Sequence, residues 1–235
     1  MAVVFDCSSN MAMFRKPYTT TSSVSFSFPP PTAIAGIIGA IVGIDNCADK
    51  KAYSAAYWDE LAGTSVAVGI RNRLRWLSAS LNLWNMKNPG KAPHIQVKHQ
   101  FVAYPEYRIY VRGRIEEELR KRLEKEEFVY TPFMGAAYAL ASIKYVGSCE
   151  EVAVTEDVLN LDSVLPLSEG IELNIASCGR VFKEIVPFQL TDCRSLAKAI
   201  TVLYTDDTKM LSLKKWGAAD VTRCLEDTVA WFPRW

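Results

Sequence analysis

The sequence predicts an α+β fold. Its core has two helices and several strands, and it carries an inserted hairpin and a β-rich C-terminal extension. Apolar and polar residues alternate with a period of two along three segments, a pattern that indicates strands. These segments are 64–76, 95–103 and 107–112. Shorter strands are expected at 3–6, where the chain is apolar enough to be central in a sheet, and at 142–146.

Two segments between these strands predict helices. The run 33–44 is apolar on all sides, so its helix should be buried, with Thr32 as its N-cap after three prolines. The run 115–127 has a narrow apolar stripe and three favourable Glu–Lys/Arg pairs at i,i+4, which indicates a helix with a solvated face. The core order is then β-α-β-β-α-β, as in ferredoxin-like folds and RNA-recognition motifs (RRMs).

The chain length sets the domain organisation that we expect. At 235 residues, with 49% apolar and 23% charged residues, the chain suits one domain with an elaboration. We expect a ferredoxin-like core over 1–150 with a hairpin inserted at about 77–98. A β-rich C-terminal extension, 151–235, should follow, interrupted by a helix near 195–200. A short helical piece starting near Asp49 is also expected.

The stretch 14–44 is the most informative part of the chain. A basic and aromatic opening (Phe14, Arg15, Lys16 and Tyr18) runs into hydroxyl residues that include Thr19, Thr20, Thr21 and Ser22, and then into an extended Ser/Phe alternation. Gly36, Gly39 and Gly43 share one helix face and would let another backbone come close. The helix is too short to span a bilayer, which takes about 20 residues, and neither a dinucleotide fingerprint nor a phosphate loop is present. A plain core helix after a polar turn would explain the same pattern.

Charge is unevenly distributed although the net charge is only +1. Residues 66–114 contain nine Lys/Arg and one acid, or +8, whereas 148–235 contain nine basic and fourteen acidic residues, or −5. This polarity suggests one face for a polyanion and another for solvent or protein. Three arginines (Arg71, Arg73 and Arg75) lie at period two, and Arg108, Tyr110 and Arg112 should share one strand face. Interleaved cations and aromatics suit a single-stranded nucleic acid, while a solvated edge strand is the plain alternative.

The segment 77–94 breaks the strand pattern and is expected to project as a loop or hairpin tip. Its apolar residues argue against an idle linker. Its distinctive residues are Trp84, Asn85, Met86, Lys87 and Lys91.

Catalytic and metal chemistry have little support in the sequence. Six cysteines without a CxxC pair, and no signal peptide, indicate reduced thiols in a cytoplasmic protein with no zinc site and no cofactor. With only two histidines, a metal site is not expected. Lys98 and His99, with Tyr53, could form a metal-free endoribonuclease site, but neighbours on a strand point to opposite faces. A histidine flanking a binding groove is the plainer interpretation.

Three segments resemble the CRISPR-associated Cas5 proteins of type I interference complexes, and the type I-B variant most closely. They are FRKPYTTTS with FSFPPPTAIAGIIGAIVG, FVAYPEYRIYV, and YTPFMGAAYALASIKYVG. The resemblance implies a non-catalytic subunit that binds the 5′ handle of a CRISPR RNA, caps the backbone filament of the Cascade complex and helps position target DNA near the large subunit. The resemblance implies no role at a membrane.

The resemblance also implies roles for particular residues. Arg15, Lys16 and Tyr18 would contact the handle, the following hydroxyls would donate to phosphate, and the hairpin would act as a thumb. Met134, Gly135 and Ala136 would form the glycine loop of the wider superfamily, although only one glycine is present. The type I-C branch instead cuts precursor RNA with a Tyr, Lys and His set. A third reading, a protein-interaction adaptor using the acidic tail, leaves the +8 segment unexplained.

Overall fold

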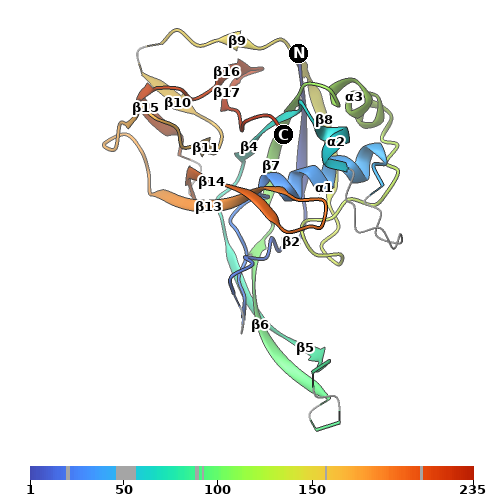
Figure 1. Ribbon diagram of the computed structural model, residues 1–235. Helices are drawn as coiled ribbons and strands as arrows, with labels where there is room; N and C mark the ends of the chain where they lie inside the picture. The colour runs from blue at the N-terminus through green and yellow to red at the C-terminus, as the bar shows by residue number, and fades with distance from the viewer. Residues whose placement is uncertain (20–21, 46–56, 88–89, 92, 157, 207–208) are drawn as a thin grey trace.

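The computed structural model describes residues 1–19, 22–45, 57–87, 90–91, 93–156, 158–206 and 209–235. Its centre is a four-stranded antiparallel sheet in the order β4-β7-β1-β8 (Figure 1). The bounds are β1 Ala2–Ser8, β4 Ser65–Ile70, β7 Glu106–Arg112 and β8 Ser142–Cys149. The prediction of a central first strand is confirmed. The protein is a mixed α+β, sheet-rich fold with few helices.

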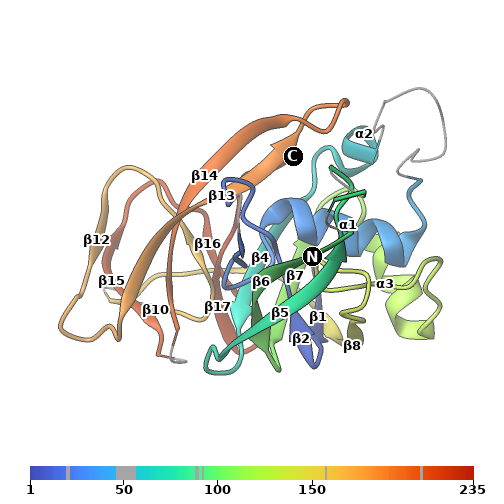
Figure 2. The same cartoon turned by 90° about the horizontal axis from the view of Figure 1, so that it is seen from below.

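Helices α1 (Pro31–Val42) and α3 (Glu116–Lys125) lie on one side of this sheet (Figure 2). Burial of α1 is confirmed, because Ile34, Ile38 and Ile41 are fully enclosed. The expected Thr32 cap is wrong: the helix begins at Pro31 and no side chain caps it. Proline is already set for the first helical position, where its missing N–H costs nothing. On α3, two of the three predicted pairs form, while Arg120 pairs with Glu124 instead of Glu116.

A long hairpin projects from the body of the protein (Figure 1). It is made of β5 (Trp76–Trp84) and β6 (His94–Ala103). The expected strand 64–76 is therefore wrong, since β4 ends at Ile70, and residues 77–84 are strand rather than loop. After Ile70 the chain leaves the central sheet, because Leu74 is buried and its N–H donates to the Asp206 carbonyl (3.0 Å).

Strand β6 belongs to a second sheet and does not continue into β7. Tyr104 has a positive φ of 48° and the chain bends there, so the two segments predicted as strands, 95–103 and 107–112, belong to different sheets. Short strands β2 (Met11–Ala12) and β3 (Ser22–Ser23) also pair with β6. The N-terminal stretch therefore lies against the base of the hairpin.

The C-terminal extension is β-rich, as expected, but the predicted helix near 195–200 is wrong. Those residues belong to β14 (Leu196–Thr205), which pairs along its length with β13 (Val181–Leu190). Long-range strand pairing overrides the weak local helix pattern. The other strands are β9 (Val152–Ala153), β10 (Leu159–Leu161), β11 (Leu165–Pro166), β12 (Ile171–Leu173), β15 (Leu211–Trp216), β16 (Val221–Cys224) and β17 (Asp227–Ala230). Short helix α2 is Tyr57–Leu61, and its expected start near Asp49 lies outside the described residues.

The extension covers the side of the central sheet that the helices leave open. Val229 and Trp231 pack with Val4, Ala67 and Tyr110 in one buried cluster. The sheet is therefore covered on both sides, unlike the open sheet of an RNA-recognition motif.

The expectation of six reduced thiols is wrong for two of the cysteines. Cys149 at the end of β8 and Cys224 at the end of β16 form a disulfide between core and extension. Cys7, Cys178 and Cys193 are free, and burial raises the pKa of the Cys7 thiol to about 12. No helix within the described ranges is long and apolar enough to cross a membrane.

Candidate functional site

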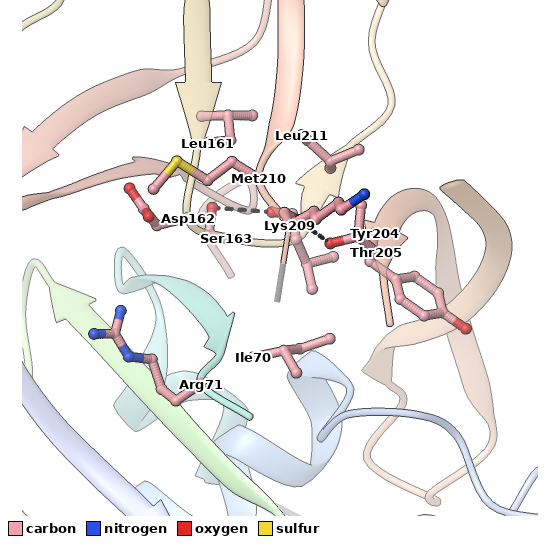
Figure 3. Close-up of a pocket in the computed structure, with 11 residues that line it drawn as sticks. Ile70, Arg71, Leu161, Asp162, Ser163, Tyr204, Thr205, Lys209, Met210 and Leu211 are labelled. Atoms are coloured by element: carbon pink, nitrogen blue, oxygen red, sulfur yellow. Dashed lines mark hydrogen bonds between the residues drawn. The ribbon is translucent and has the colours of Figure 1, made fainter. Parts of the chain in front are cut away.

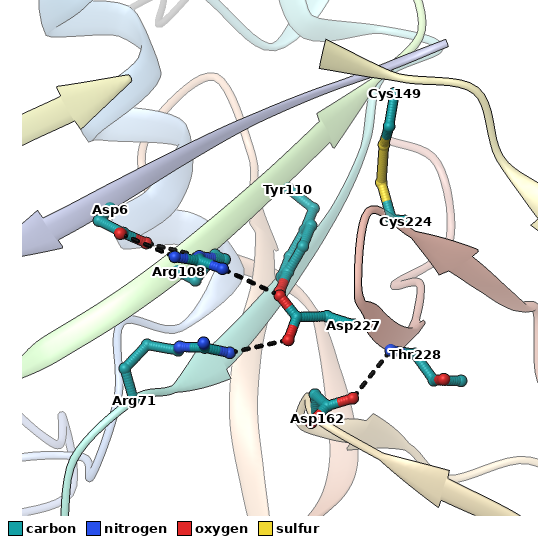
Figure 4. Close-up of polar contacts among 9 residues, drawn as sticks. All are labelled: Asp6, Arg71, Arg108, Tyr110, Cys149, Asp162, Cys224, Asp227 and Thr228. Carbon is teal, nitrogen blue, oxygen red and sulfur yellow. Dashed lines mark hydrogen bonds and ion pairs between the residues drawn. A yellow bond between two sulfur atoms is a disulfide. The ribbon is translucent and has the colours of Figure 1, made fainter. Parts of the chain in front are cut away.

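The arginines on the central sheet bind carboxylates of the protein itself (Figure 4). Arg108 on β7 donates to both oxygens of Asp6 (2.7 and 3.0 Å) and to Asp227 (3.1 Å). Arg71 also donates to Asp227 (2.9 Å), as does the Tyr110 hydroxyl (2.7 Å). Asp227 thus joins β17 of the extension to two strands of the core.

This packing perturbs the protonation of the buried groups. Burial raises the pKa of Asp227, but hydrogen bonds from Tyr110, Arg71 and Arg108 outweigh it, and the pKa lies below its usual value. Burial and the nearby carboxylate raise the pKa of Tyr110. Asp162, which accepts a hydrogen bond from the Thr228 N–H (2.8 Å), has its pKa raised mainly by burial.

Arg112 is enclosed in a similar way. Its guanidinium pairs with Glu151 and Asp220 and lies over the Trp231 ring, 4.2 Å from the centroid. The acidic extension therefore neutralises part of the basic segment, so Arg71, Arg108 and Arg112 do not belong to a free basic face. Arg71, Arg108 and Arg112 lie in intramolecular ion pairs, which argues against direct contact of these three with RNA phosphates. Sequence reasoning missed their acidic partners, although the opposite charges of 66–114 and 148–235 were the signal for Glu151, Asp220 and Asp227.

The described residues of the segment 13–26 form the two arms of a bend, from which Arg15 and Tyr18 face solvent. Phe14 and Phe26 are buried and anchor its two arms, whose backbones bond to each other (Phe26 N to Phe14 O, 2.8 Å). The bend is held by the Thr19 hydroxyl, which donates to the Lys16 carbonyl (2.9 Å). Arg15 is exposed, and 68% of Tyr18 is exposed, so a cation and an aromatic ring face solvent at the bend. Thr20 and Thr21 lie outside the described residues.

Lys16 points inward instead. Its ammonium pairs with Glu184 of β13 and lies 5.3 Å from the centre of the Phe26 ring. The other Glu184 oxygen accepts the Tyr204 hydroxyl (3.2 Å), which also bonds Ser27 (2.8 Å). The side chain predicted to meet RNA therefore ties the bend to the extension.

Several cations of the hairpin and of the residues that lead into it remain exposed. Ser22 of β3 pairs with Lys98 of β6, so this one predicted hydroxyl lies beside an exposed lysine. Arg73 and Arg75 are exposed where the hairpin begins and form no ion pair within the described part of the chain. At the hairpin tip Lys87, Lys91 and Met86 are exposed, Trp84 stacks on His94 (4.6 Å between centroids), and the Asn85 side chain accepts the Lys87 N–H (3.2 Å).

A groove of about 750 Å³ begins at Arg15 and runs along the glycine face of α1. A Cβ placed on Gly36 would meet nothing within 4 Å, so no backbone of the described segments packs at that glycine. Phe133 and Tyr130 form the opposite wall, and each is about half exposed. A cation next to exposed aromatic rings is suited to hold unstacked bases.

A smaller cavity of about 240 Å³ lies between β4 and the extension (Figure 3). Its lining includes Arg71 and Asp162, together with Ile70, Thr205 and Met210. Arg71 is the one described residue of this lining that was predicted from the sequence to bind RNA, and Asp227 already binds its guanidinium.

The predicted glycine loop supports the bend rather than offering a free backbone. Gly135 has φ 82°, and a Cβ there would lie 2.2 Å from the Met13 carbonyl oxygen. The Met13 N–H donates to the Met134 carbonyl (3.0 Å), with Ala136 in the following turn. Glycine is therefore required at residue 135 by close approach to the strand before Phe14.

Lys98 and His99 do not meet in space. They are successive residues of regular β6, paired with Ser80 and Ala79 of β5, so their side chains lie on opposite faces. His99 is 8% exposed, its Nδ1 bonds the Val97 carbonyl (3.0 Å), and its ring stacks on Phe101. Tyr53 lies outside the described residues. No cluster of three or more His, Cys, Asp or Glu able to hold a metal was found among the described residues.

Known proteins resemble this chain in fold and in sequence. A CRISPR protein from Archaeoglobus fulgidus matches with a TM-score of 0.54 at 16% identity, over 98% of this chain and 99% of that one. A chain of a CRISPR RNA-guided surveillance complex matches with a TM-score of 0.51 at 9% identity, over 98% and 91%. Comparison with curated proteins finds no match. The family described as CRISPR-associated protein (Cas_Cas5) matches residues 2–165, more than half of the sequence, and the chain belongs to this family.

Proposed function

We propose that this chain is a non-catalytic, RNA-binding subunit of a type I-B CRISPR interference complex, in which it holds the 5′ handle of the CRISPR RNA. It caps the backbone filament and helps position target DNA near the large subunit, within the cytoplasm. Family membership and the fold shared with a surveillance-complex chain support a place in such an assembly. The strand order β4-β7-β1-β8, with helices α1 and α3 on one side, supports a ferredoxin-like core over 1–150.

The observation that carries RNA binding is the exposed surface between the bend and the hairpin. It comprises Arg15 and Tyr18 of the bend, Lys98 at the middle of the hairpin, and Arg73 and Arg75 where the hairpin begins. Guanidinium and ammonium groups neutralise phosphates, and exposed rings stack on bases, which are the two needs of single-stranded binding. The groove beside Arg15 offers Phe133 and Tyr130 as further stacking surfaces.

This surface differs from the one expected from the sequence. Because Arg71, Arg108 and Arg112 are engaged by carboxylates, the proposal assigns phosphate contact to Arg73 and Arg75 and base contact to Arg15 and Tyr18. Lys16 acts by fixing the bend through Glu184. The thumb hairpin, with Trp84 at its tip, faces a neighbouring backbone subunit.

A fluorescence titration with labelled handle RNA and a scrambled RNA, across a salt series, tests the proposal. Arg73→Ala and Arg75→Ala should each flatten the slope of log affinity against log salt by about 0.7 on both RNAs. Arg15→Ala and Tyr18→Ala should cost about 1–3 kcal/mol on the handle and much less on the scrambled RNA. Lys214→Ala, which removes an exposed charge from the extension, is the matched control and should change neither quantity. Equal effects of Lys214→Ala and Arg73→Ala, or no salt-sensitive binding, would refute the assignment.

A further inference from the structure

The outer edge of β5 is open along the projecting hairpin. β5 pairs only with β6 in the described structure. The Ala103 N–H donates to the Arg75 carbonyl (2.8 Å) and the Asn85 N–H donates to the Pro93 carbonyl (2.9 Å). Along an antiparallel pair of strands, hydrogen-bonded and non-hydrogen-bonded residue pairs alternate. Odd-numbered residues of β5 therefore direct their N–H and C=O groups at β6. The N–H and C=O groups of Ser78, Ser80 and Asn82 therefore point away from the hairpin.

This edge lacks the usual protection against pairing with another strand. Exposed edges in soluble proteins are commonly blocked by charged side chains, proline or a bulge. The nine residues of β5, WLSASLNLW, contain no charge and no proline, and their pairing with β6 is regular. Trp76, Leu77, Leu83 and Trp84 are all more than 40% exposed. The edge is available and apolar.

The sequence of β5 is close to a palindrome about Ser80. Read from Trp76 the residues are Trp, Leu, Ser, Ala and Ser80. Read backwards from Trp84 they are Trp, Leu, Asn, Leu and Ser80. An antiparallel strand that pairs with its own copy meets its sequence in reverse. Centring such a pair on Ser80 places Trp76 opposite Trp84, Leu77 opposite Leu83 and Ser78 opposite Asn82 of the second copy.

The backbone geometry agrees with this centre. Pairing about Ser80 matches even residues with even residues, and these are the residues whose backbone groups point outward. Ser80 would exchange two N–H···O=C bonds with its own copy. The leucines at odd positions would form one apolar face, continued on each side by Ile95 and Val97 of β6. No like charges meet along the edge.

We propose that the outer edge of β5 is a self-pairing surface, through which two copies of this chain form a two-fold symmetric dimer with a continuous β6-β5-β5-β6 sheet. The symmetry closes the interface, because each copy uses the same patch. The absence of any cation on β5 disfavours RNA as the occupant, and the palindrome favours a second copy over an unrelated strand. This inference is independent of the RNA assignment, and the dimer would cover the edge of the proposed thumb until the chain joins a complex.

Analytical ultracentrifugation over roughly micromolar to sub-millimolar concentrations tests the proposal, since an interface of this size is weak. The wild-type mass should rise from that of a monomer toward twice that value. Ser80→Pro removes the outward N–H while sparing the bonds to β6, and should weaken the dimer by at least about tenfold. Ser80→Thr keeps the N–H and should dimerise like the wild type. Circular dichroism should show that both variants remain folded.

Cross-linking tests the register. Ser80→Cys should form a covalent dimer on mild oxidation in a Cys193→Ser background, because a hydrogen-bonded pair places its Cα atoms about 5.5 Å apart, within disulfide range. Ser78→Cys, equally exposed but facing Asn82, should not. A monomer at all concentrations, dimerisation unaffected by Ser80→Pro, or equal cross-linking of the two cysteine variants would overturn the proposal.

Discussion

Asp227 accepts hydrogen bonds from three side chains of the central sheet, so Asp227→Asn measures how strongly this contact holds the extension on the core. The Asp227 side chain is 9% exposed and meets Arg71 at 2.9 Å, Arg108 at 3.1 Å and Tyr110 at 2.7 Å. Asparagine keeps the shape but removes the charge that both guanidinium groups face.

The expected loss is about 2–3 kcal/mol of unfolding free energy. Breaking a buried ion pair costs about 3–5 kcal/mol. Three features reduce that value here: Arg71 is 31% exposed, Arg108 keeps Asp6, and Tyr110 can still donate to the amide oxygen. For a chain of this size the loss corresponds to a fall in Tm of roughly 4–12 °C. Urea unfolding followed by circular dichroism, with the slope m held constant, gives the value.

Asp162→Asn is the matched control. Burial raises the pKa of Asp162, so the folded protein stabilises its charge less than water does, and an amide oxygen can still accept the Thr228 N–H. Its stability should stay within about 0.5 kcal/mol of the wild type or rise.

The effect of Asp227 has a defined pH dependence. Because its pKa is lowered in the folded protein, its contribution is fully present above the unfolded value of about 3.9 and is lost as pH falls through the lower folded value. The gap between wild type and Asp227→Asn should be constant from about pH 5 to 8 and shrink below about pH 4. A gap under about 0.5 kcal/mol at pH 7 would show that the Asp227 contacts do not measurably hold the extension on the core.

Two further predictions follow from the loop and the hairpin. Gly135→Ala should lower the free energy of unfolding by about 2 kcal/mol or more, since the residue needs φ 82° and its Cβ would strike the Met13 carbonyl. Gly147→Ala, where a Cβ meets nothing, is the control and should cost far less. The midpoints of urea unfolding measure both losses. The purified chain should leave labelled repeat-containing precursor RNA uncut in chelator, because Lys98 and His99 face opposite sides of β6. Site-specific cleavage that disappears in His99→Ala would instead establish the endoribonuclease alternative.

The sequence alone determined the elements with strong local signals. The all-apolar run after three prolines gave the buried helix α1, and the charged striped run gave α3, because helix burial follows from which faces carry apolar residues. The apolar start of the chain placed β1 at the centre of the sheet, and the motifs from Phe14 to Gly147 were sufficient to indicate the family.

Only the tertiary structure decided what each charged side chain faces. Arg73 and Arg108 belong to the same basic segment, 66–114, yet one is exposed where the hairpin begins and the other is enclosed by Asp6 and Asp227. A period of two tells which residues share a strand face, but not what covers that face. The cover here comes from β16 and β17, more than a hundred residues later, and such a long-range contact leaves no local pattern in the sequence to predict it.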